Sequence, residues 1–171
     1  MFAAKPILAA VFAVGVGYAA SPYVTLYRLD HAMRTGDSAT LQRLVDWPAV
    51  REGIKEDICD GLADDSAQAM DHGQLPPFGA SFVQGIAANA VDRAVTPEAL
   101  ADFTRHDGRV QSVTADVTWA FFDDPTDFVV TLHVPGQQGP VRLEMTLKDA
   151  RWQVTRIWLT PSLLQEANAR T

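Results

Sequence analysis

The chain has 171 residues, of which 47% are hydrophobic and 20% are charged, and its 14 Lys and Arg against 21 Asp and Glu give a net charge of −7. This length is typical of one domain, and the composition excludes a disordered or collagen-like chain. The acidic balance argues against a nucleic-acid partner. The one cysteine, Cys59, excludes a disulfide framework and multi-cysteine metal centres, and we expect it to be a buried, inert thiol.

The N-terminal segment has the pattern of an export signal or a membrane anchor. Lys5 is followed by an uncharged stretch that ends only at Arg28. A short basic head and an apolar run fit a secretory signal, with Gly17-Tyr18-Ala19 as the cleavage site. The same stretch fits an uncleaved membrane helix, which needs about 20 mostly apolar residues. A buried core helix is the third alternative, and it fits poorly because the segment is apolar on all sides.

These alternatives define the predicted domains and the expected location. We expect residues 1–20 to be a signal peptide or membrane anchor and residues 21–171 to form a single domain. The domain would lie in the cell envelope. It would be anchored to the inner membrane and face the periplasm, or it would be free in the periplasm if the leader is cleaved.

Helix signals fill the first half of the predicted domain. Ser21-Pro22 predicts a helix start and Gly36 predicts its end. Asp37 and Asp46 are predicted to cap the next two helices, and Thr96-Pro97-Glu98 begins a last short one. The helical period predicts inward positions at Tyr23, Leu26, Tyr27, Met33, Leu41, Leu44, Val45, Val50, Ile54, Ile58 and Leu62, and at Phe82, Ile86, Ala90 and Val91 in a helix over 80–95.

After Gly108 the apolar period changes to two, which predicts strands. Three turns, at 123–125, 135–140 and 149–150, separate four strands and indicate an antiparallel meander. Helices followed by an antiparallel sheet predict an α+β fold. The alternating apolar positions are Val113, Ala115, Val117, Trp119 and Phe121, then Phe128, Val130, Leu132 and Val134, then Val141, Leu143, Met145 and Leu147, with a last strand over 152–159.

Two stretches of the chain resemble an uncharacterised bacterial family. They are the pattern over 21–55, with Ser21-Pro22-Tyr23, Gly36-Asp37 and Leu44-Val45-Asp46-Trp47-Pro48, and the closing run over 152–159. The family is known only as a domain of unknown function whose members carry a short N-terminal membrane segment. The resemblance implies an envelope protein, names no activity and transfers no functional residue. The layout is also similar to the NTF2-like or cystatin-like cone, which contains both isomerases and binding modules.

No motif that would carry chemistry is complete. The four histidines, His31, His72, His106 and His133, lack metal-ligand spacing, and Gly79-Ala80-Ser81-Phe82-Val83 lacks the second glycine of a nucleophile elbow. Phosphate-binding and dinucleotide-binding glycine motifs are absent outside the apolar leader. The six acids from Glu56 to Asp71 read as a solvated helix face. We therefore expect no catalytic, cofactor-binding or metal-binding residues and no cofactor.

Two arginines have both a structural and a functional interpretation. Arg51 is expected to pair with Asp46 or Asp30, or to bind an anion in a pocket. By strand alternation Arg156 is expected on the same face as Trp152, Val154 and Trp158. There it packs along its stem, stacks on Trp158 or lies at a pocket rim.

The sequence favours a non-catalytic, membrane-tethered or exported protein that binds a small apolar ligand or a protein partner. The alternative is a small isomerase or hydratase that uses an Asp or a His inside the cone. A pocket of ~300 Å³ or more with a converging acid–base pair would separate the two hypotheses.

Overall fold

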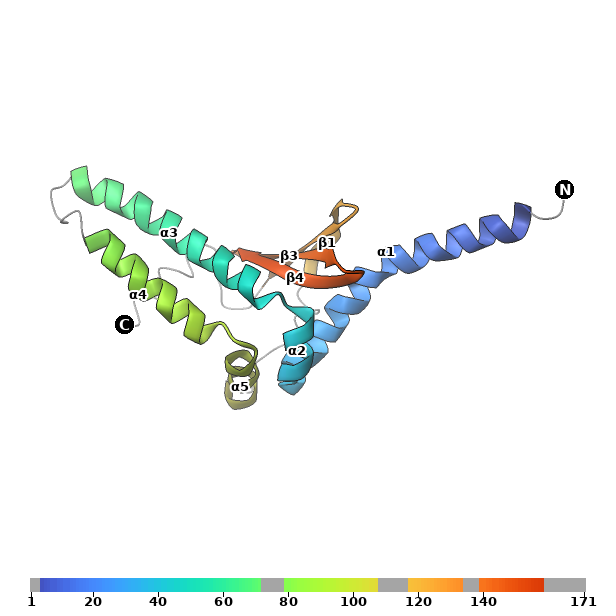
Figure 1. Ribbon diagram of the computed structural model, residues 1–171, viewed down its shortest axis with the longest axis horizontal. Helices are drawn as coiled ribbons and strands as arrows, with labels where there is room; N and C mark the ends of the chain where they lie inside the picture. Colours follow the sequence, from blue (N-terminus) through green and yellow to red (C-terminus); the bar gives the residue numbers. More distant parts are fainter. Residues whose placement is uncertain (1–3, 72–78, 108–116, 134–138, 159–171) are drawn as a thin grey trace.

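The computed structural model describes residues 4–71, 79–107, 117–133 and 139–158. Helices precede strands along this part of the chain, which confirms the predicted α+β fold (Figure 1). The expected strand positions Val113, Ala115, Val134 and Leu159 lie outside the described residues. The elements are α1 (Ala4–Thr35), α2 (Ser38–Leu44), α3 (Trp47–Asp71), α4 (Gly79–Ala94), α5 (Pro97–Asp107), β1 (Val117–Asp124), β2 (Asp127–His133), β3 (Pro140–Lys148) and β4 (Arg151–Trp158).

The four strands form one antiparallel sheet in the order β1-β2-β3-β4, which confirms the predicted meander. Phe128 of β2 lies opposite Phe122 and Met145, and these side chains share the buried face. The β1–β2 turn is held by Asp124, whose Oδ1 accepts from the backbone N–H of Thr126 at 2.7 Å. The two-residue turn between β3 and β4 has positive φ at both positions, Asp149 and Ala150, as expected for a tight hairpin.

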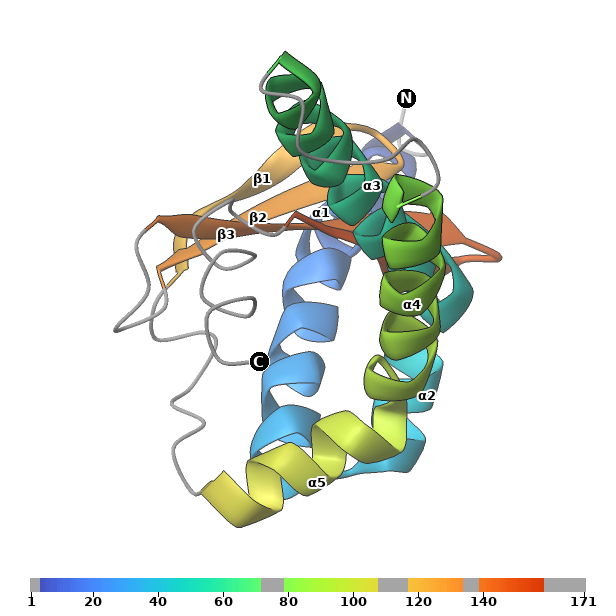
Figure 2. The same cartoon turned by 90° about the vertical axis from the view of Figure 1, so that its left-hand side faces the viewer.

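The core lies between the sheet and the helices. The second half of α1, α2 and α5 lie on one side of the sheet, and α3 and α4 extend away as a helical hairpin (Figures 1 and 2). The chain between α2 and α3 pairs with the outer edge of the sheet, because Val45 bridges Val154 in parallel. The buried apolar side chains are Leu26, Leu29, Ala32, Leu41, Val45, Trp47, Val50, Ile54, Val91, Ala101, Phe128, Val129, Val130, Leu132, Leu143, Met145, Trp152 and Val154.

Helix α1 does not begin at Ser21-Pro22, so that prediction is wrong. It is one helix of 32 residues with Pro22 buried inside it. A proline at this position leaves the carbonyl of Tyr18, four residues earlier, without its helical partner. The Ser21 hydroxyl donates to that carbonyl oxygen at 2.6 Å, so the helix continues. Figure 1 shows α1 changing direction where it meets the sheet, as expected at a proline.

The helix ends agree with the predicted caps. Gly36 has φ of 63° and the backbone N–H of Asp37 donates to the Ala32 carbonyl at 2.9 Å, so glycine ends α1 in a left-handed turn. Asp37 accepts from the Thr40 N–H at 3.1 Å and Asp46 accepts from the Ala49 N–H at 3.2 Å. The Thr96 hydroxyl accepts from the Ala99 N–H at 3.1 Å and caps α5.

Several predicted inward positions are exposed. In β1 a register shift lies between Val117 and Trp119, so Val117 packs on the core while Trp119 and Phe121 point outward, 61% and 56% exposed. Such a bulge breaks the period of two, and the sequence pattern cannot reveal it because both faces of β1 carry apolar residues. Other predicted inward residues that prove exposed are Tyr23, Tyr27, Ile86 and Ala90.

Candidate functional site

Residues 4–20 of α1, here called the arm, project from the domain (Figure 1). Large apolar side chains are exposed on all sides of the arm, including Ile7 at 64%, Phe12 at 73% and Val14 at 73%. A water-soluble core helix buries such residues, so this exposure argues against the core-helix alternative. By length and composition the helix could cross a membrane, and a signal sequence passes the same test.

Aromatic side chains fix the base of the arm to the sheet. The ring of Tyr18 stacks on Phe122 with centroids 5.8 Å apart, and the Tyr23 ring packs edge-on against Phe128 at 4.9 Å. The Tyr23 hydroxyl also donates to the Ala120 carbonyl at 3.1 Å. The Trp152 indole donates to the Ser21 hydroxyl at 2.7 Å. The arm is therefore held in a defined direction by contacts on both sides of Ser21-Pro22.

An open groove of about 930 Å³ begins at the base of the arm. Its walls are α1 on one side, and α2 together with the β3–β4 turn on the other. At the arm end it is lined by Gly17, Ala20 and Val24, which are small or apolar. One to two helical turns further on, charged side chains replace them.

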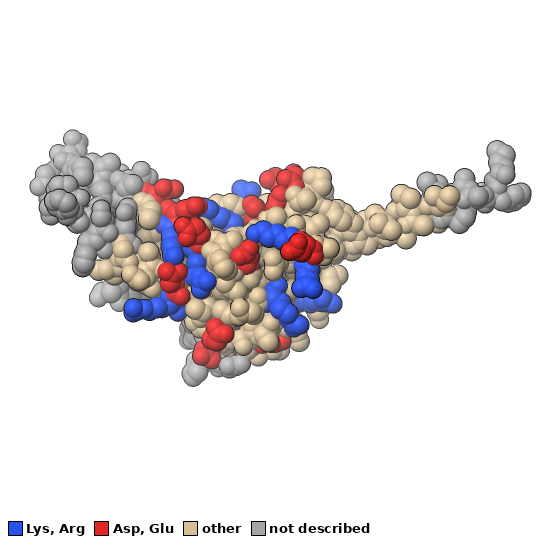
Figure 3. Space-filling model, viewed as in Figure 1, with Lys and Arg blue, Asp and Glu red and all other residues tan. Residues whose placement is uncertain are grey.

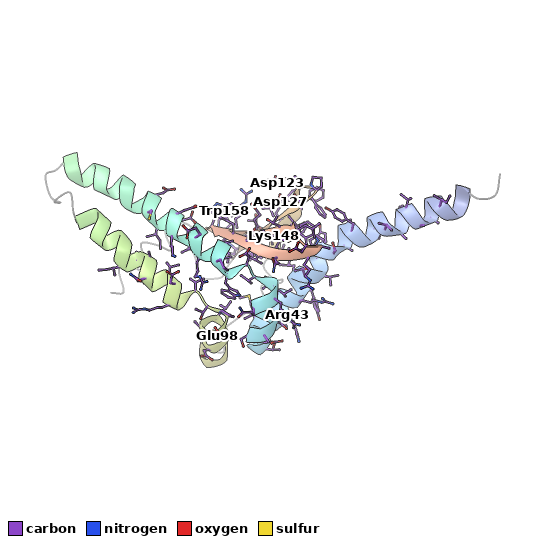
Figure 4. All side chains as sticks on the ribbon, in the orientation of Figure 1. Arg43, Glu98, Asp123, Asp127, Lys148 and Trp158 are labelled. Carbon is purple, nitrogen blue, oxygen red and sulfur yellow. The ribbon has the colours of Figure 1, made fainter. Side chains whose placement is uncertain are left out.

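Three arginines line the charged end of this groove. They are Arg28 of α1, Arg43 of α2 and Arg151 at the start of β4. Figure 4 labels Arg43 on α2, and Figure 3 shows Lys and Arg side chains on this face close to the arm. Arg43 donates to the Thr40 hydroxyl at 3.1 Å. Within the described residues no carboxylate lies at ion-pair distance from Arg28 or Arg151.

His31 and Asp37 also line the groove, so one imidazole and one carboxylate face the same space. Hydrogen bonds from Thr40 hold the pKa of Asp37 below its usual value of 3.8, because they stabilise the charged carboxylate. A carboxylate that caps a helix in this way is a weak base. The groove therefore fits the binding of an anion better than proton transfer.

A second, shallower groove of about 570 Å³ contains Asp46 and Arg51. Asp46 Oδ2 accepts from Lys148 Nζ at 2.8 Å, and this contact lowers the pKa of Asp46 below 3.8. Arg51 does not pair with Asp46 or Asp30, so that prediction is wrong. Its nearest carboxylate is Asp92 of α4, at 3.9 Å, because α3 packs against α4.

Asp30 is fully buried in α1 and pairs with Arg34 one turn later, at 2.8 Å. This is a local pair between residues four apart on one helix.

Arg156 joins β4 to α3. It pairs with Glu56 and, at 2.8 Å, with Asp57, and its guanidinium lies 5.7 Å from the centre of the Trp158 ring. The hydrogen bond to Glu56 raises the pKa of Arg156. A register shift in the β3–β4 ladder places Arg156 opposite Glu144, on the face away from Trp152 and Val154, so the prediction that it shares their face is wrong. Arg156 does share a face with Trp158, as predicted. The start of the acidic run is thus a partner of Arg156 and not only a solvated face.

The remaining predicted residues do not converge. His31 lies in the groove, His133 is exposed at the end of β2, and His72 and the side chain of His106 lie outside the described residues. In the part of the chain that the structure describes, no group of three or more His, Cys, Asp or Glu side chains could hold a metal ion. Cys59 is a free thiol that is half-buried rather than fully buried.

Comparison with known proteins identifies one family. A family profile described as "Protein of unknown function (DUF2939)" matches residues 11–103, more than half of the chain. The chain belongs to this family. The match begins inside the arm and runs through the five helices to α5, so the arm and the groove-forming helices α1 and α2 are part of the family pattern. Neither a curated protein nor a solved structure matched the chain.

Membership of DUF2939 agrees with the resemblance inferred from the sequence and assigns no activity. Sequence reasoning missed the groove arginines. Arg28 was visible as the first charge after the apolar stretch, but Arg43 and Arg151 are separated from it along the chain and meet it only in the folded domain.

Proposed function

We propose that this DUF2939 protein is a membrane-anchored binding module of the cell envelope. In this proposal the arm stays in the bilayer and the α+β domain lies directly on the membrane surface. The observation that carries it is the continuity of α1, whose exposed apolar half passes without a break into a half that contributes Leu26, Leu29 and Ala32 to the core.

This continuity favours an anchor over a cleaved signal. Cleavage after Ala19 would separate the Tyr18 carbonyl from the Ser21 hydroxyl and remove the Tyr18 ring from its contact with Phe122. Both contacts belong to the joint between arm and sheet, so a cleaved chain would lose part of the packing of its own domain.

Exposed aromatic side chains at the base of the arm support a location at the membrane surface. The ring centroids of Trp119 and Phe121 of β1 are 6.0 Å apart. The ring of Phe121 lies 6.3 Å, between centroids, from that of Phe122, which stacks on Tyr18. Trp and Tyr are enriched at the interface between lipid and water, where their rings contact lipid and their polar atoms contact water. Binding rather than catalysis is favoured because the groove presents several arginines, and among its described lining residues no hydrogen bond joins His31 to Asp37 as an acid–base pair.

The proposal is tested by the location of the full chain in bacterial cells. Membranes are washed with alkaline carbonate, and a C-terminal alkaline phosphatase fusion reports the side on which the domain lies. We expect the chain to stay in the pellet and the fusion to be active. A chain released by carbonate would contradict the anchor, and an inactive fusion would contradict export.

A further inference from the structure

The groove at the base of the arm carries more positive than negative side chains in an acidic protein. Arg28, Arg43 and Arg151 line it, and Asp37 is the one carboxylate among its lining residues. The whole chain has a net charge of −7, so a concentration of arginines at one place is a local reversal of charge. The guanidinium group binds phosphate through paired N–H donors, which makes arginine well suited to a phosphate ligand.

The shape of the groove places a second requirement on its ligand. Its arm end is lined by Gly17, Ala20 and Val24, and Arg28 follows Val24 by one helical turn. A side chain added at Gly17 would meet no other atom within 4 Å, so this wall is open along the arm. The groove is therefore apolar where the arm begins and cationic about one turn further from it. That order matches a phospholipid, whose acyl chains lie in the bilayer and whose phosphate lies at its surface.

Apart from Asp37, many acidic side chains of the domain lie away from the groove. Asp123 and Asp127 lie on one side of the sheet and Arg43 on the other (Figure 4). The six acids from Glu56 to Asp71 are on α3, which extends away from the arm (Figure 1). An anion at the membrane surface is therefore attracted to the groove face.

We propose that this groove binds the phosphate headgroup of an anionic phospholipid from the leaflet next to the domain, with Arg28 and Arg151 as its main ligands and Arg43 beside them. The inference rests on the proposed membrane anchorage. A lipid held in this way would fix the height and rotation of the domain on the bilayer, because the groove lies between the arm and the β3–β4 turn.

The test uses the full chain in neutral detergent and native mass spectrometry with phosphatidylglycerol or phosphatidylcholine of the same acyl chains. We expect phosphatidylglycerol to bind at least about tenfold more tightly than phosphatidylcholine. The double variant Arg28→Gln with Arg151→Gln should remove that preference, because it removes the charge-assisted hydrogen bonds to the headgroup. The matched control is Arg93→Gln with Arg142→Gln, which removes the same charge from exposed positions outside the groove. It should bind as the wild type does.

Other outcomes overturn the inference. Equal binding of the two lipids, or an unchanged preference in the groove variant with a native circular dichroism spectrum, would contradict a headgroup site. Displacement of the lipid by glycerol phosphate at a similar concentration would show that the ligand is a soluble phosphate. None of these results depends on carbonate extraction, so failure of the anchor and failure of the lipid site are distinguishable.

Discussion

The two halves of α1 belong to one helix but have opposite relations to the rest of the molecule. Among residues 7–20 the described side chains are exposed and mostly apolar. In residues 21–35 Leu26, Leu29 and Ala32 face the core, whereas Tyr27 and Arg28 face outward. The difference is one of pattern rather than of hydrophobic content. A helix that is apolar all round is suited to lipid, and one with a single apolar stripe is suited to packing on a sheet.

The two halves meet at Ser21-Pro22, where side chains replace a lost backbone hydrogen bond. The Ser21 hydroxyl donates to the Tyr18 carbonyl and accepts from the Trp152 indole, so it serves both the helix and the sheet. We therefore expect substitutions in the second half of α1 to change the stability of the domain, and substitutions in the first half to change membrane insertion. Substitutions at Ser21-Pro22, the joint between the two halves, should change the packing of the helix on the sheet.

The largest expected effect on folding is at Leu29, which is 5% exposed in the second half of α1. Leu29→Ala should lower the free energy of unfolding by about 2–5 kcal/mol, because it removes a buried side chain and leaves a cavity. Denaturation of the full chain in detergent, followed by tryptophan fluorescence, measures this change. Val16→Ala, on the exposed arm, is the control and should leave the transition unchanged. A similar loss in both variants would contradict the division of α1.

In the arm, Val14→Arg should have the complementary effect. Arginine at the centre of a membrane helix costs about 2.5–3.5 kcal/mol of insertion free energy, so the carbonate-resistant fraction should fall. The unfolding transition of the detergent-solubilised domain should not change, because Val14 is 73% exposed and contributes nothing to the core. Val14→Leu is the matched control. An unfolded domain in the arginine variant would show that the arm packs on the protein.

At the joint, Ser21→Ala should destabilise the domain by about 1–3 kcal/mol, because the Tyr18 carbonyl and the Trp152 indole both lose a hydrogen-bond partner. Ser21→Thr keeps the hydroxyl and should retain most of the stability. Denaturation curves of the two variants and the wild type measure the difference in the free energy of unfolding. Equal stability of the alanine variant and the wild type would mean that the proline is tolerated without this hydroxyl.

A smaller effect is expected at Asp46, which caps α3 and pairs with Lys148. Asp46→Ala should cost about 1 kcal/mol, and Asp46→Asn should cost less because asparagine still caps the helix. Since the folded pKa of Asp46 is lowered, its stabilisation is present above its unfolded pKa of about 4 and is lost as the pH falls through the folded value.

Denaturation curves at several pH values measure this contribution. In the asparagine variant the fall in stability below about pH 4 should be shallower than in the wild type. An identical pH dependence would contradict the role of the charged pair.

Much of the fold was predictable because its local signals are strong. Glycine at position 36 and the capping aspartates at 37 and 46 mark helix ends in the sequence itself, and the alternation in β2 and β3 identifies their buried faces. The errors occur where a tertiary contact replaces a local signal. The Ser21 hydroxyl allows a helix to continue through proline. Irregularities in β1 and β4 place Trp119 on the opposite face from Val117, and Arg156 on the opposite face from Val154.

The candidate site was less predictable than the fold. Its arginines come from α1, α2 and β4, and no spacing along the chain brings them together. Only the folded arrangement places them at the base of the arm. The same holds for Arg156, whose partners Glu56 and Asp57 lie on α3.

The intact mass of the chain isolated from washed bacterial membranes tests most directly whether the arm is an uncleaved membrane anchor. We expect a mass that includes residues 1–20, from chain recovered in the carbonate-resistant fraction. A chain that begins at Ala20 and is recovered in the soluble periplasmic fraction would contradict it, because the continuous helix would then be a cleaved leader.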